Sequence, residues 1–144
     1  MATIRKWIQA FEKEGIKIHA VTPQNEPLNH GNSASLFMGW EEARDFIKTG
    51  LGPAFKEAGV TTKIYVFDHN YNYDNLADQK SYPTKIYDDA EASQYIAGAA
   101  YHNYGGNRSE LLEYPQTLSQ QGTAFYGNLH RYLELRSRFG STPA

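Results

Sequence analysis

The stretch Ile16-Lys17-Ile18-His19-Ala20-Val21-Thr22-Pro23-Gln24-Asn25-Glu26-Pro27 decides the fold of this chain. Its first half is a short apolar run rich in β-branched residues, which is typical of a buried strand. Glu26 follows just past the carboxyl end of that strand, between an asparagine and a proline. In α/β folds functional side chains lie at that end of the strands. A carboxyl group on a rigid strand end, beside an amide, suits proton transfer to a leaving group.

The sequence around this stretch alternates between helical and extended patterns. Apolar residues recur at helical spacing from residue 4 to Gly15, and again over 40–58 and, more weakly, over 84–94. Gly50 and Pro53 interrupt the second of these helices, so we expect a kink or a break there. Strands are predicted over 17–22, 62–67 and 95–101, and His19, inside the first, is expected to be buried. The order helix, strand, repeated three times, predicts a parallel sheet in an α/β fold.

Polar residues follow each of the three predicted strands. Because right-handed crossovers bring the carboxyl ends of parallel strands together, we expect all of them at one edge of the sheet. Three such clusters in register are stronger evidence for a functional site than any one of them alone. The six residues are Asn25 and Glu26, Asp68 and His69, and His102 and Tyr104.

Length and composition limit the possible functions. With 144 residues the chain is long enough for one domain with its own core, but a complete eight-stranded α/β barrel takes about 250 residues. A net charge of -2 gives no bulk field that would favour nucleic acid or an anionic membrane. The absence of cysteine excludes disulfides and thiolate metal sites. No apolar stretch predicts a membrane span, and the first residues show no signal-peptide pattern, so the localisation stays unknown.

The pattern changes after Gly106. Residues 117–139 read as one amphipathic helix, no fourth strand is predicted, and residues 140–144 read as a disordered tail. We therefore expect an α/β unit over residues 1–112 and a divergent C-terminal helix and tail over residues 113–144.

Three segments together resemble glycoside hydrolase family 30, the glucosylceramidase-like β-glycosidases, over about residues 4–112. They are Glu14 to Pro27, Leu51-Gly52-Pro53-Ala54-Phe55, and Tyr101-His102-Asn103-Tyr104-Gly105-Gly106. The resemblance implies a partial (β/α)8 TIM barrel, made of about three β/α units that correspond to units four to six. It also implies retaining hydrolysis of a β-linked glycoside or oligosaccharide by two glutamates, without a cofactor, in a secreted or periplasmic protein.

By this resemblance Glu26 is the general acid/base, and Asn25 hydrogen-bonds the 2-hydroxyl of the reacting sugar. Asp68, His102 and Tyr104 would line the same sugar subsite, with His69 as a further candidate. The nucleophile of the family is expected after the seventh strand in a Thr-Glu context, and this sequence contains no such dipeptide. The departure from the family begins at about residue 113. We therefore expect a truncated, frame-shifted or excised fragment.

Other readings remain open for these residues and for the chain. Glu26 could be a solvated loop acid, Asp68 an Asx-turn or cap residue, and His102 a hydrogen-bonded core histidine. A metal site of Glu26, His69 and His102 is possible by residue type, but no close-spaced ligand pair supports it, and we predict no metal. As a whole, the chain could be the catalytic-acid portion of a glycosidase or an inactive fragment that binds sugar weakly. It could also be a half-barrel that closes by pairing its open sheet edges with itself or a partner.

Overall fold

A computed structural model describes residues 2–31, 36–72, 76–112 and 124–126 of the chain. Its centre is a parallel four-stranded sheet in the order β1-β2-β3-β4. The strands are β1 (Ala20–Val21), β2 (Lys63–Asn70), β3 (Ile96–His102) and β4 (Ala124–Tyr126). Because the strands are parallel and follow the order of the sequence, the predicted α/β partial barrel is confirmed.

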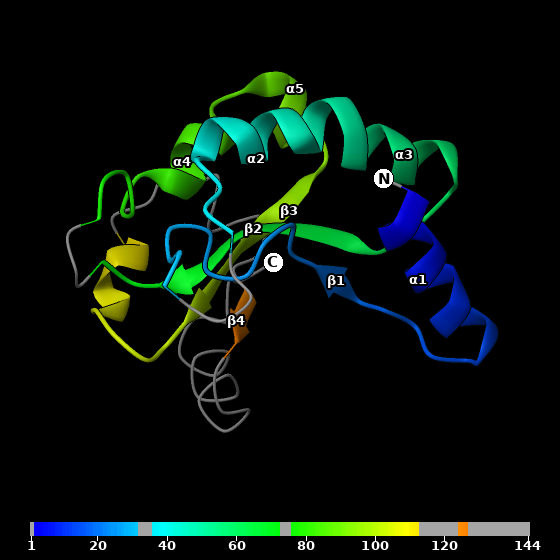
Figure 1. Cartoon of the computed structure of the whole chain (residues 1–144), viewed down its shortest axis with the longest axis horizontal. Helices are drawn as coiled ribbons and strands as arrows, with labels where there is room; N and C mark the ends of the chain where they lie inside the picture. The colour runs from blue at the N-terminus through cyan, green and yellow to red at the C-terminus, as the bar shows by residue number, and fades with distance from the viewer. Residues whose placement is uncertain (1, 32–35, 73–75, 113–123, 127–144) are drawn as a thin grey trace, which may run out of the picture.

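The helices between β1 and β2 and those between β2 and β3 lie along one side of the sheet (Figure 1). α1 (Ala2–Lys13) precedes β1. Between β1 and β2 the chain forms α2 (Trp40–Phe46), the π-helical segment η1 (Ile47–Leu51) and α3 (Gly52–Glu57). Between β2 and β3 it forms α4 (Tyr82–Tyr87) and α5 (Ala90–Ser93), and after β3 the 3-10 helix η2 (Arg108–Leu112). The break expected near Gly50 and Pro53 is therefore a π-helical turn, and Asp89, which caps α5, divides the third predicted helix in two.

The hydrophobic core lies between the helices and the sheet. Ile47, Leu51 and Phe55 on the helices and Ile64 and Val66 on β2 are buried. Burial of each such side chain stabilises the fold by roughly 1.5–3 kcal/mol relative to its exposure. Every residue of β2 after Lys63 is buried, as expected for a strand of a parallel sheet that is covered on both faces.

The first two strands differ in length from the prediction. Only Ala20 and Val21 of the range 17–22 form β1, and His19 is exposed, so the prediction that it is buried was wrong. One backbone hydrogen bond to β2 continues just before β1, where the His19 carbonyl accepts from Lys63 N at 3.0 Å. β2 extends to Asn70, three residues beyond the predicted end. Two of the candidate site residues therefore lie within a strand instead of after it.

A β-bulge at Asp68 interrupts the pairing of β2 with β3. Phe67 pairs with Ala100 and His69 with Tyr101, so Asp68 is left out of the register. The φ angles of Phe67 and Asp68 are 79° and 51°, a left-handed conformation that costs non-glycine residues energy and is concentrated at functional sites. The bulge turns the Asp68 carbonyl out of the ladder, and this carbonyl accepts from Glu26 N at 2.9 Å.

In the C-terminal region the structure describes only residues 124–126 of the predicted helix 117–139. These three residues form β4, whose pairing begins at Ala100↔Ala124, so the helix prediction was wrong for them. Three residues are too few for a periodic pattern, and for that reason no fourth strand was predicted. The rest of the predicted helix and the tail lie outside the described residues.

Candidate active site

The main chain of Glu26 is fixed from two sides. Its N–H donates to the Asp68 carbonyl, and its own carbonyl accepts from Asn29 N at 2.8 Å. The φ angle of Glu26 is 45°, so this residue also adopts the left-handed conformation. The residue is 8% exposed. These contacts hold the carboxyl group at the carboxyl edge of the sheet, where β1 ends.

Both carboxylate oxygens of Glu26 have a partner. Oε1 lies 3.0 Å from Nδ1 of His102, and Oε2 accepts from Nδ2 of Asn29 at 2.8 Å. Burial raises the pKa of Glu26, but the hydrogen bonds from Asn29 and His102, with the charge of His102, outweigh it and lower the pKa below its ordinary value. The group is therefore a carboxylate at neutral pH.

His102 joins Glu26 to Asp68. The second ring nitrogen, Nε2, lies 3.1 Å from Oδ1 of Asp68, and Thr22 donates its hydroxyl to Oδ2 of Asp68 at 2.6 Å. The hydrogen bond to Asp68 raises the pKa of His102, and the charges of Asp68 and Glu26 add to this effect against the opposing effect of burial. A protonated imidazole donates from both nitrogens, so it satisfies one carboxylate on each side.

The structure thus brings Glu26, Asp68 and His102 together, as predicted for the three strand ends. Tyr104 lies beside them, with its ring edge-on to that of His102 at a centroid separation of 5.5 Å and 84% of the residue exposed. Asn25 is exposed and contributes to none of the hydrogen bonds described above. His69 is buried, and its ring stacks on that of Phe67 at a centroid separation of 5.4 Å. Its Nδ1 accepts a hydrogen bond from Asn70 N. The roles of all six residues stay predictions.

Sequence reasoning missed four residues of this region, Thr22, Asn29, Asn70 and Glu110. Thr22 and Asn29 hydrogen-bond the two site carboxylates directly. The position of Asn29, three residues after Glu26 in a turn, was an available signal, because side chains at that spacing reach back to the residue that opens the turn. Asn70 and Glu110 hold the loops behind the site, and nothing in the local sequence pointed to those contacts.

Two further properties bear on the chemistry. Within the described ranges no group of three or more histidine, aspartate or glutamate residues is placed to hold a metal ion. In the same part of the chain, no helix has both the length and the apolar character needed to cross a membrane.

The site therefore contains a fixed carboxylate, an imidazole with a raised pKa, and an exposed aromatic ring. This set can transfer a proton at the rim of the sheet and stack against a sugar ring.

Comparison with known proteins identifies the fold and its family. The family model described as "Glycosyl hydrolase family 30 TIM-barrel domain" matches residues 1–125. The endo-1,6-beta-D-glucanase of Neurospora crassa is 37% identical over 71% of this chain and 20% of its own length. The lysosomal acid glucosylceramidase of Mus musculus is 32% identical over 69% of this chain and 19% of its own.

A solved structure of an endo-beta1,6-glucanase superposes with a TM-score of 0.79 at 69% sequence identity, over 85% of this chain and 27% of that one. The chain therefore spans about a fifth of the length of these curated relatives and about a quarter of the solved structure. Since the family model covers most of its length, this chain belongs to glycosyl hydrolase family 30.

Proposed function

We propose that this chain carries the acid/base half of a retaining β-glycosidase site, with Glu26 as the group that donates and takes back the proton. The observation that carries the proposal is the position of Glu26 in a chain of family 30. It is buried at the carboxyl edge of the sheet and connected to Asp68 through His102. In a barrel of this kind catalytic groups lie at that edge.

The reaction we propose has two steps. In the first, protonated Glu26 donates its proton to the glycosidic oxygen while a second carboxylate attacks the anomeric carbon, so the bond to the leaving group breaks and a glycosyl ester forms. In the second, Glu26 takes a proton from water, and the resulting hydroxide displaces the ester. The lowered pKa of Glu26 suits the second step. A charged second carboxylate about 5–5.5 Å away would raise that pKa and prepare the group for the first.

For the substrate we propose a β-1,6-linked glucan. The support is the similarity to proteins named endo-1,6-beta-glucanases, among them a solved structure at 69% identity. The exposed ring of Tyr104 beside His102 offers a flat apolar face with a hydroxyl group, which suits a glucose ring. Asn25, exposed one residue before Glu26, is available to the 2-hydroxyl.

A second candidate is sugar binding without turnover. The sequence lacks the Thr-Glu dipeptide expected for the nucleophile. Glu110, the described acid that follows β3, does not fill that role, because its carboxylate accepts a hydrogen bond from Asn72 N in a contact between two loops. Titration with a β-1,6-linked glucotriose, followed by NMR of the His102 and Tyr104 side chains, tests for binding. We expect saturable shifts with this trisaccharide and none with its α-1,6-linked isomer. Equal shifts with both, or none with either, would contradict the proposed substrate.

We also propose that the open sides of the sheet pair with another chain. Among the described residues β1 has a partner only in β2, and β4 only in β3, so each presents an unpaired side. Sedimentation over a concentration series should show dimers or larger species. A monomer at every concentration, with one sharp unfolding transition, would show that the edges are protected within the chain.

A further inference from the structure

The side chain of Asn70 holds the loop that follows β3. Its Oδ1 accepts from the main-chain N–H of Tyr104 at 3.1 Å and from that of Gly105 at 3.2 Å. Asn70 is the last residue of β2 and is 5% exposed. A single buried oxygen on the rigid end of one strand therefore fixes two successive peptide groups at the end of the next.

Two other contacts join the same loops. Glu110 on η2 accepts from Asn72 N at 3.1 Å. Gly106 lies against Tyr71 so closely that a Cβ there would be 2.4 Å from the Tyr71 Cβ, so only glycine fits. The φ angle of Gly106 is 81°, which glycine also adopts without strain. The loops after β2 and β3 are thus joined at three consecutive points, of which the Asn70 contact is the one nearest the site.

The main chain of Asn70 is itself secured. Gln79, which is 1% exposed, donates from Nε2 to the Asn70 carbonyl at 3.4 Å and to the Tyr71 carbonyl at 3.3 Å. The Asn70 N–H donates to His69 Nδ1 at 2.8 Å. The acceptor oxygen on Asn70 is therefore presented from a fixed backbone, and its contact with Tyr104 is preorganised.

Tyr104 combines an anchored main chain with an exposed side chain. Its N–H is hydrogen-bonded to Asn70, yet the residue is 84% exposed, and its ring meets the edge of His102. Burial of the ring does not hold this residue in place, so its backbone contact must do so. We propose that Asn70 is a positioning residue that fixes Tyr104 at the rim so that the Tyr104 ring forms one wall of the sugar site. The sugar-binding part of this inference rests on the proposed function.

Amide hydrogen exchange of the full chain tests the anchoring directly. In the unmodified chain the amides of Tyr104 and Gly105 should exchange at least about tenfold more slowly than in an unfolded peptide, because each is bonded to a buried acceptor. In Asn70→Leu, which keeps the size but removes the acceptor, both should speed up about tenfold. In Asn70→Asp, which keeps the oxygen, both should stay within about threefold of the original rates.

Three outcomes would overturn the anchoring. They are unprotected amides in the unmodified chain, unchanged rates in Asn70→Leu, and equally fast exchange in Asn70→Asp and Asn70→Leu. Should Asn70→Leu fail to fold, the other two proteins still test the anchoring. Fast exchange of the Tyr104 and Gly105 amides in the unmodified chain or in Asn70→Asp would overturn it. Asn103→Leu, a change at an exposed asparagine of the same loop, is the matched control and should leave both amides protected.

Affinity for the β-1,6-linked glucotriose tests whether the anchored ring of Tyr104 forms a wall of the sugar site. Asn70→Leu should weaken binding about tenfold, Asn70→Asp should restore it, and Asn70→Leu should have no further effect in a Tyr104→Ala background, because both changes act on the same ring. An undiminished effect in that background would show that Asn70 does not act through Tyr104. If the unmodified chain does not bind the trisaccharide, the proposed function fails, while the exchange rates decide the anchoring independently.

Discussion

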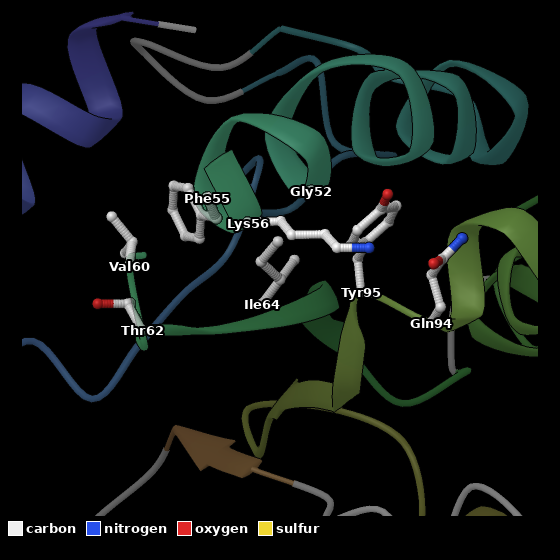
Figure 2. A pocket seen from close by; sticks show the side chains of 8 residues that line it. All are labelled: Gly52, Phe55, Lys56, Val60, Thr62, Ile64, Gln94 and Tyr95. Carbon is white, nitrogen blue, oxygen red and sulfur yellow. The ribbon is translucent and has the colours of Figure 1, made fainter. Parts of the chain in front are cut away.

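The two ends of the same parallel sheet differ in almost every physical respect. At the carboxyl end Glu26, Asp68 and His102 form a buried charged network, and the backbone of Phe67 and Asp68 adopts left-handed φ angles. At the amino end, side chains of α3, β2 and the segment before β3 surround a hollow of about 320 Å³ (Figure 2). Its lining combines apolar side chains, such as Phe55 and Ile64, with uncharged polar and aromatic ones and a single cationic one, Lys56.

This difference places the candidate catalytic groups at one end of the sheet and close packing of helices against strands at the other. Buried charges and strained backbone are costly, and they occur where the strand ends converge and where the proposed reaction needs them. The amino end holds the helices against the sheet by close packing, as at Gly52, where a Cβ would lie 2.2 Å from Cγ of Tyr95. Changes at the carboxyl end should therefore act mainly on proton transfer, on sugar binding and on the pH dependence of stability, and changes at the amino end should act mainly on stability at every pH.

The largest effect is expected at the carboxyl end. The purified chain should hydrolyse β-1,6-glucan and aryl β-glucosides at rates several orders of magnitude below those of a retaining glycosidase with both carboxylates, because its sequence contains no Thr-Glu dipeptide to supply the second one. Reducing-sugar release and aryl release measure this. Rapid turnover that disappears in Glu26→Gln would contradict the expectation and direct the search for a nucleophile to Glu110 and Glu113.

At the amino end, Gly52→Ala should destabilise the fold without affecting sugar binding. Overpacking against Tyr95 costs about 1–3 kcal/mol, which outweighs the gain of about 1 kcal/mol in helix propensity. Chemical denaturation measures the free energy of unfolding. Tyr95→Ala is the matched background, since removal of the ring should turn the effect of Gly52→Ala into a gain. Destabilisation of the same size in both backgrounds would show that contact with Tyr95 is not the cause.

The smallest effect is a pH dependence of stability that belongs to the carboxyl end. The raised pKa of His102 contributes stability that is complete below its ordinary value of 6.5 and is lost as the pH rises through the folded value. The lowered pKa of Glu26 contributes stability that is complete above 4.5 and is lost as the pH falls through the folded value. We therefore expect this contribution to be greatest between about pH 4.5 and 6.5.

Asp68→Asn provides the control for this pH dependence. The hydrogen bond to Asp68 is the largest cause of the raised His102 pKa, so its loss should move the NMR titration of His102 toward lower pH and flatten the alkaline side of the stability profile. Gly52→Ala should lower stability equally at every pH. A His102 titration that does not move in Asp68→Asn would disprove the assigned cause.

The same contrast explains what could be predicted from the sequence. Periodic patterns depend on neighbours within a few residues, so they gave the alternation of helices and strands and the convergence of Glu26, Asp68 and His102. The bulge at Asp68 depends on a hydrogen bond to Glu26, which is 42 positions away in the chain, and no local pattern encodes it. β4 is too short to show a period. The contact of Asn70 with Tyr104 likewise joins two strand ends whose distance only the folded sheet defines.

The central claim is that Glu26 is the acid/base of a β-glycosidase. The most direct measurement places residues 1–112 into the corresponding part of the solved endo-beta1,6-glucanase that is 69% identical, and determines kcat/KM on β-1,6-glucan with Glu26 and with Glu26→Gln. The account predicts an active chimera that loses about 10²–10⁴-fold in kcat/KM on the glucan with Glu26→Gln. It also predicts that an aryl glucoside, whose leaving group needs no proton, still releases its aryl group in a rapid first turnover. Equal activity of the two chimeras on the glucan would contradict it.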